Sequence, residues 1–191
     1  MPTGVHIRDA REQLFHAAER VLLRDGPSAL TSRAVTEEAG VAKGVLHRHF
    51  TDFDDFLAQL VHNRAQQVEI DSIGLHTSAG TNTVVDNIAA TLAMTFETVA
   101  VAIVALIIFR DELRTRLRES WPTGVPILAD AVNMLDAYLR AEQTHGRVAR
   151  DADTISIART LIGAAHLLFA DRKGIPPTSA EIRTIVANAL R

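Results

Sequence analysis

The apolar residues of this chain recur at the three- and four-residue spacing of amphipathic helices along most of its length. No stretch alternates apolar and polar residues for long, as a half-buried strand would. The chain has 191 residues, of which 47% are hydrophobic, and this is enough to build a packed core. The sequence therefore predicts an all-α protein, and the segments between capping and helix-breaking residues give about nine helices.

The composition disfavours several classes of protein. The chain has no cysteine, which excludes disulfide scaffolds, thiolate metal sites and cysteine nucleophiles. It also lacks a serine nucleophile elbow, a phosphate-binding glycine loop and a His-Glu-x-x-His zinc motif, so we expect neither an enzyme nor a bound metal or cofactor. The net charge of −3 gives no general attraction to nucleic acid, so any argument for DNA binding rests on local pattern.

Two observations argue against secretion and membrane insertion. Residues 1–13 carry several charges, among them Arg8, Asp9 and Glu12, and contain no apolar run of the kind found in a signal peptide. The longest uncharged apolar run, Val99–Phe109, has 11 residues, whereas a membrane-spanning helix needs about 20. We therefore expect a cytoplasmic protein with no membrane partner.

The first third of the chain contains closely spaced helix start and stop signals. Helices are predicted over Ile7–Asp25, Ser32–Ala39 and Ala42–His49, with Thr31 as the N-cap of the second. Gly40, which can adopt a positive φ, lies between the second and third helices. Two short helices joined by such a turn are the helix-turn-helix arrangement, in which one helix crosses the DNA backbone and the next enters the major groove.

The side chains of the third predicted helix support that interpretation. Helical spacing turns Leu46 and Phe50 inward, which leaves polar residues for the outer surface. A lysine at the helix start can donate hydrogen bonds to guanine, and hydroxyl and guanidinium groups at the start of the preceding helix are suited to phosphate oxygens. The predicted DNA-contacting residues are Thr31, Ser32, Arg33, Lys43, Gly44, His47, Arg48 and His49.

A fourth helix is predicted to start at Asp52, with Asp55 reaching back as its capping partner, and to extend to about Asp71. Turn-forming residues follow it. We therefore divide the chain into a DNA-binding domain, residues 1–62, which includes the start of this helix, and a ligand-binding and dimerisation domain, residues 63–191.

The second domain is expected to be a larger helical core. Residues 84–117 are apolar nearly all round and are predicted as one long helix that other helices surround. Another helix is predicted over Ile127–Glu142, followed by one capped by Asp151 or Asp153 and a last one capped by Ser179.

The block from Leu30 to Phe50 resembles the DNA-binding helices of the tetracycline repressor (TetR) family, and the resemblance extends over residues 7–62. It implies a homodimeric transcriptional regulator, most often a repressor, that binds an inverted-repeat operator in double-stranded DNA and is released by a small molecule. The rest of the chain resembles the family only as a helical regulatory domain of suitable length. The residues that carry the resemblance are Gly26-Pro27, Leu30-Thr31, Arg33, Ala39-Gly40-Val41, Lys43-Gly44, Leu46 and His49-Phe50.

Three positions depart from the family pattern. His47 replaces the usual tyrosine, Ala42 replaces serine or threonine, and Phe53 replaces lysine, so each position loses a usual contact to the DNA backbone. These departures leave open a helical small-molecule-binding protein that has lost specific DNA binding, and an activator is a further alternative. His47 and His49 do not suggest a metal site, because residues two apart on a helix point in nearly opposite directions.

In the second domain the sequence provides candidates for two surfaces. An apolar effector cavity with a few polar groups is the usual form of a small-molecule site. The resemblance implies a dimer formed by the last two helices, packed as a four-helix bundle. The candidate ligand-binding residues are Met94, Phe109, Trp121, Met134, Tyr138, His166 and Phe169, and the candidate dimer residues are Ile157, Leu161, Ala165, Leu168, Ile182, Ile185 and Val186.

Overall fold

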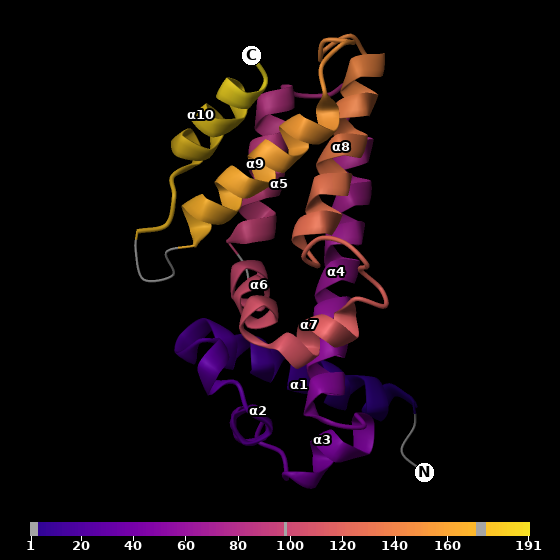
Figure 1. Ribbon diagram of the computed structural model, residues 1–191, viewed down its shortest axis with the longest axis vertical. Coiled ribbons are helices and arrows are strands. Elements are labelled where there is room, and N and C mark those ends of the chain that lie inside the picture. Colours follow the sequence, from indigo (N-terminus) through magenta and orange to yellow (C-terminus); the bar gives the residue numbers. More distant parts are fainter. Residues whose placement is uncertain (1–3, 98, 171–174) are drawn as a thin grey trace. The chain divides into compact units, whose positions relative to one another are not determined.

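The computed structural model describes residues 4–97, 99–170 and 175–191. Within these ranges the chain is helical and contains no strand, which confirms the predicted all-α fold (Figure 1). A short 3-10 helix, η1 (Pro27–Ala29), follows the first α-helix. The α-helices are α1 (Gly4–Asp25), α2 (Ser32–Glu38), α3 (Gly44–His49), α4 (Phe53–Thr77), α5 (Val84–Phe96), α6 (Ala100–Phe109), α7 (Asp111–Leu117), α8 (Leu128–Thr144), α9 (Thr154–Phe169) and α10 (Ser179–Ala189).

The predicted single helix over residues 84–117 is wrong, because α5, α6 and α7 occupy this stretch. Arg110 adopts an extended backbone conformation, φ −116° and ψ 106°, and so ends one helix and serves as the N-cap of the next. The apolar composition of α5 and α6 hides the break between them, because uniformly apolar segments give no change of period at a helix end.

Two further boundaries differ from the prediction. α4 continues six residues beyond the expected end at Asp71, to Thr77. The cap of α10 is Thr178, whose side chain accepts from the amide of Glu181 while the Glu181 carboxylate accepts from the amide of Thr178. This reciprocal pair is a capping box, which uses the residue before the predicted Ser179.

The chain divides into two compact units. Unit 1 contains the described residues up to Asn63 together with Ala102–Thr123, and unit 2 contains Arg64–Val101 together with Gly124–Arg191. The first division between the units, after Asn63, lies one residue from the predicted domain boundary after residue 62. The segment that carries most of α6 and all of α7 belongs to unit 1, together with the N-terminal helices.

The cores of the two units differ in composition. In unit 1 the rings of Phe15, Phe50 and Phe53 all lie near Phe56, with centroid distances of 5.0 to 5.6 Å. In unit 2, α9 packs on α8, and α10 packs on α5 and α9, around aliphatic side chains. In the described part of the chain no single helix is long and apolar enough to cross a membrane, and α5 and α6 meet that requirement only as a pair.

Candidate nucleic-acid interface

The helix-turn-helix of unit 1 is built from local signals. The Thr31 hydroxyl accepts a 3.1 Å hydrogen bond from the amide of Ala34 and so caps α2, as predicted. Gly40 has φ 67°, a conformation that a side chain would strain, and it turns the chain between α2 and α3. α3 begins after Lys43 without a side-chain cap, because Ala42 and Lys43 offer no acceptor.

The outer face of α3 carries the groups expected for base and phosphate contacts. Leu46 is buried and Phe50 is 3% exposed, so both point inward as predicted. Lys43, Gly44, His47 and Arg48 are exposed on the other side. Among the described residues neither cation, Lys43 or Arg48, forms an ion pair, which leaves both free to meet a polyanion.

The remaining predicted contacts lie at the start of α2 and the end of α3. Arg33 is exposed and pairs with Glu37 one turn along the helix, at 2.7 Å. The hydroxyl oxygen of Ser32 is buried and has no hydrogen-bond partner within the described ranges. His49 is half-buried, and its carbonyl accepts a 3.2 Å hydrogen bond from Arg11. Thr31 and Arg33 are therefore the more accessible of these groups.

Acidic charge on α2 is neutralised from the side of α1. The carboxylate of Glu38 accepts from Arg20 at 2.7 Å and from Arg24 at 2.8 Å. These hydrogen bonds, that of Arg20 first, lower the pKa of Glu38. The pairing keeps two α1 arginines engaged and reduces the repulsion that Glu38 would exert on a phosphate.

The corner between α3 and α4 is held by a chain of polar contacts. Asp52 caps α4 as predicted by accepting from the amide of Asp55, and Asp55 accepts in turn from the amide of Thr51. The guanidinium of Arg11 lies 4.6 Å from the centre of the Phe50 ring and donates to Gln59. The end of α3 is therefore fixed to both α1 and α4.

The segment around α7 contributes two arginines to the same corner, and the sequence prediction missed both. Arg110 donates to the Asp54 carboxylate and the Leu30 carbonyl, each at 3.3 Å. Arg116 donates to Asp52 at 3.1 Å. Asp52 has a lowered pKa, first because of the Asp55 amide and then because of Arg116. No sequence signal marks contacts between residues more than fifty positions apart.

Residues 14–60 match the family model described as bacterial regulatory proteins, tetR family. These residues contain α2, the glycine turn and α3, whose geometry is that of a helix-turn-helix. The segment that contains the helix-turn-helix is therefore similar to the tetR family.

A similar segment is found in a curated relative. An uncharacterised HTH-type transcriptional regulator of Haemophilus influenzae is 35% identical over 54 residues, which are 28% of this chain and 29% of that protein. The alignment thus spans under a third of the relative's length.

Solved structures share the fold of the whole chain. The regulator FadR of Bacillus subtilis, determined with stearoyl-CoA, has a TM-score of 0.66 and 21% identity over 94% of this chain and 97% of its own. GusR of Salmonella enterica has a TM-score of 0.68 and 14% identity, with 95% of each chain covered. At these identities the likeness shows the fold alone.

The predicted effector residues are divided between the two units. Phe109 and Trp121 belong to unit 1. Phe109 is exposed, and the centre of the Trp121 ring lies 4.8 Å from that of the His62 ring. In unit 2 the centre of the Phe96 ring lies 6.3 Å from that of His166 and 6.0 Å from that of Phe169. The other three residues, also in unit 2, are Met94, which is exposed, and Met134 and Tyr138, which are buried.

Burial lowers the pKa of His166, and its Nδ1 atom is buried without a hydrogen-bond partner among the described residues. Two small cavities lie elsewhere in unit 2: one of about 140 Å³ between α5 and α10, and one of about 170 Å³ beside Ile157 and the chain end. Neither is lined by a predicted effector residue, so the effector site stays a prediction. No group of three or more His, Asp or Glu side chains in the described part of the chain is placed to hold a metal ion.

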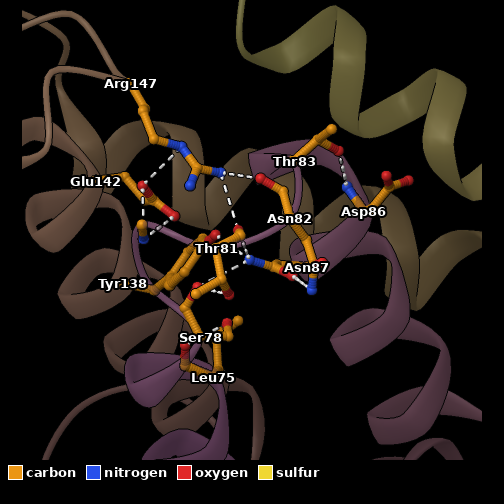
Figure 2. Close-up of polar contacts among 11 residues, drawn as sticks. Leu75, Ser78, Thr81, Asn82, Thr83, Asp86, Asn87, Tyr138, Glu142 and Arg147 are labelled. Carbon is orange, nitrogen blue, oxygen red and sulfur yellow. Dashed lines mark hydrogen bonds and ion pairs between the residues drawn. The ribbon is translucent and has the colours of Figure 1, made fainter.

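A buried polar network fixes the loop between α4 and α5 in unit 2 (Figure 2). Glu142 is fully buried, accepts from the amide of Gly80 and pairs with Arg147 at 3.2 Å. Arg147 also donates to two carbonyls of the loop, and Asn87 donates to the hydroxyl of Tyr138 at 2.9 Å. Burial and the contact with Glu142 raise the pKa of Tyr138 to about 12.

The sequence prediction did not single out Glu142, although a signal was present. Glu142 lies four residues after Tyr138 and seven after Leu135, on the apolar stripe of α8. A charged residue on a buried helix face needs a partner, and this one has Arg147.

The residues predicted for the dimer interface lie in two environments. Four of them, Leu161, Ala165, Ile182 and Val186, are buried by their own chain and leave no surface for a partner. Ile157, Leu168 and Ile185 are half-buried. The exposed residues of α9 are Ser156, Arg159, Thr160, Gly163 and Leu167, most of which are small or apolar.

Proposed function

We propose that this protein is a homodimeric transcriptional regulator that binds an inverted-repeat operator and responds to a small molecule. One observation carries the proposal: the exposed face formed by Lys43, Gly44, His47 and Arg48, anchored by buried Leu46 within the tetR-family segment. Donors on this face suit guanine edges and phosphates. Binding to DNA would place the protein in the cytoplasm.

A two-fold dimer would present two α3 helices to successive major grooves about 34–36 Å apart. The open face of α9, with Gly163 and Leu167, is the surface we assign to a partner in unit 2, since Leu167 is 77% exposed. A large exposed aliphatic side chain beside small residues favours close helix packing. In this proposal the first 62 residues read DNA, and unit 2 forms the dimer.

Two things support a response to a small molecule: the fold itself and one solved structure that shares it. The structure of FadR from Bacillus subtilis contains stearoyl-CoA, so a chain of this fold can accommodate a small-molecule ligand. In this chain an effector that binds one conformer more tightly would shift the population toward it, with α4 as the connecting helix. Release from the operator, and hence repression, is the direction we propose.

The test is a selection of randomised duplexes with purified protein, followed by titration of the enriched sequence at several salt concentrations. We expect an inverted repeat whose affinity falls steeply as salt rises, because each phosphate contact contributes about 0.9 to the slope of log K against log salt. Lys43→Ala should relax base preference, and Arg33→Ala should weaken binding to all sequences alike.

A second candidate function follows from Ala42, His47 and Phe53, each of which lacks a backbone contact usual in the family. It is a helical small-molecule-binding protein without an operator. Failure of the folded wild-type protein to enrich any sequence would favour this second function over the first.

A further inference from the structure

Arg110 joins parts of unit 1 that are far apart in the sequence. It lies between α6 and α7, and its side chain is 26% exposed. Its guanidinium donates through one nitrogen to Asp54 and through another to the Leu30 carbonyl, each at 3.3 Å. The planar guanidinium suits this task because it can direct several donors at fixed angles.

The two acceptors lie at the entrances to the helices that flank α3. The Leu30 carbonyl immediately precedes Thr31, the N-cap of α2, and Asp54 lies in the first turn of α4. α3 lies between α2 and α4 in the chain, so holding the start of α2 against the start of α4 restrains the two helices that flank α3. One guanidinium holds both of them.

The aromatic residue at position 53 takes part in the same contact. The guanidinium carbon of Arg110 lies 5.3 Å from the centre of the Phe53 ring, and this ring stacks on Phe56 at 5.6 Å. Arginine over an aromatic face is attracted by the negative face of the ring. Phe53, which departs from the family pattern, thus provides a platform for a cation that comes from residue 110.

We propose that Arg110 is a positioning residue for operator recognition: it pre-organises α2, α3 and α4 for DNA without touching DNA itself. The proposal rests on the function proposed above. It assigns a DNA-binding role to a residue outside the matched segment 14–60 and outside the predicted DNA-binding domain, in the stretch Ala102–Thr123 that packs into unit 1.

The test compares Arg110→Gln and Arg110→Lys with a matched control, Arg114→Gln, in the full chain. Arg114 is also an arginine of this segment, but its ion pair is with Asp111 of the same helix. Dissociation constants are measured for the selected operator and for a random duplex across a salt series. We expect Arg110→Gln to weaken operator binding about tenfold, because the variant loses the guanidinium that bonds to both Asp54 and the Leu30 carbonyl. Arg110→Lys should be intermediate, and Arg114→Gln unchanged.

The salt slope separates positioning from direct contact. A residue that positions others leaves the slope unchanged while affinity falls, whereas loss of a phosphate contact reduces the slope by about 0.9. Unchanged operator affinity in Arg110→Gln, or a slope reduced by that amount, would overturn the positioning role. Asp54→Asn provides a second variant: in its background the effect of Arg110→Gln should shrink, and an undiminished effect counts against the role.

Circular dichroism melting of every variant checks that the fold is retained. The outcome for wild type separates the two proposals. An operator that is bound equally by wild type and Arg110→Gln overturns only the role of Arg110, whereas a wild-type protein that selects no operator overturns the proposed function and this role together.

Discussion

The two units hold distant segments together in different ways. In unit 1 the contacts between remote segments are ion pairs near the surface, such as Arg110–Asp54 and Arg116–Asp52, whose side chains are 26% to 49% exposed. In unit 2 an exposed pair, Arg183–Asp86, also joins α10 to α5, but the network that holds the loop between α4 and α5 centres on Glu142, which is fully buried. Pairs at the surface contribute little to global stability, whereas a buried charge requires all of its partners at once.

The difference matches what each unit is proposed to do. A surface that meets DNA gains from cations that can leave a carboxylate for a phosphate, as Arg33 can leave Glu37. A loop that connects α4 to α5 gains from a fixed geometry, which the Glu142 network supplies through the amide of Gly80. Unit 1 therefore depends for stability on its aromatic core, and unit 2 depends in part on buried polar contacts.

The largest expected effect is that of Phe56→Ala in unit 1. Phe56 is fully buried and contacts three other phenylalanine rings, so its loss should lower the free energy of unfolding by about 3–5 kcal/mol. Urea unfolding followed by circular dichroism measures this. Phe109→Ala, which removes a ring that is 61% exposed, is the control and should change stability by less than about 0.5 kcal/mol. If both substitutions lowered the free energy of unfolding equally, the aromatic cluster would not be the main source of stability in unit 1.

Glu142→Ala tests the other half of the comparison. It leaves Arg147 and the Gly80 amide without their acceptor, so we expect a loss of about 3 kcal/mol, at the low end for a buried pair because Arg147 is 25% exposed. Glu142→Gln keeps an acceptor and should cost less. The same urea titration applies, and a stability equal to wild type for Glu142→Ala would remove the distinction between the units.

A smaller effect is expected from the matched helix caps, Thr31 in unit 1 and Thr178 in unit 2. Each hydroxyl accepts from the amide three residues on, so Thr31→Ala and Thr178→Ala should each cost about 1 kcal/mol. Only Thr31→Ala should also weaken operator binding. Comparable loss of DNA affinity in Thr178→Ala would contradict the assignment of DNA binding to unit 1.

The smallest effects are those of pH, and they have opposite directions in the two units. In unit 1 the pKa of Asp52 is lowered in the folded state, so its contribution is present at neutral pH and is lost as pH falls through the acid range. In unit 2 the pKa of Tyr138 is raised to about 12, so stability declines as pH rises from about 10 toward that value. Unfolding measured across pH should show Tyr138→Phe abolishing the alkaline decline and Asp52→Asn reducing the acid one.

The sequence predicted the features that local signals encode. The Thr31 cap, the Gly40 turn and the inward Leu46 each depend on residues within one helical turn, and the structure shows all three. The break between α5 and α6 was missed because apolar residues on every side of a helix leave no amphipathic period. The break at Arg110 has no such cause, because α7 is charged and buries only Leu113 and Leu117.

Contacts between remote segments could not be predicted from one sequence. Arg110 lies 80 residues from Leu30, and nothing near either position indicates the other. The dimer prediction identified the apolar stripes of α9 and α10. An apolar stripe shows that a helix face is buried, but not whether the same chain or a partner buries it. For Leu161 and Val186 the cover is the chain's own core.

The placement of two aromatic residues makes the units optically distinguishable. The chain has one tryptophan and one tyrosine, and Trp121 lies in unit 1 whereas Tyr138 lies in unit 2. Indole emission from Trp121, beside His62, therefore reports on the unit proposed to bind DNA, and phenol absorbance from Tyr138 reports on the other. Operator or effector added to the unlabelled wild-type protein can thus be followed in each unit separately, with the chain's own chromophores as the probes.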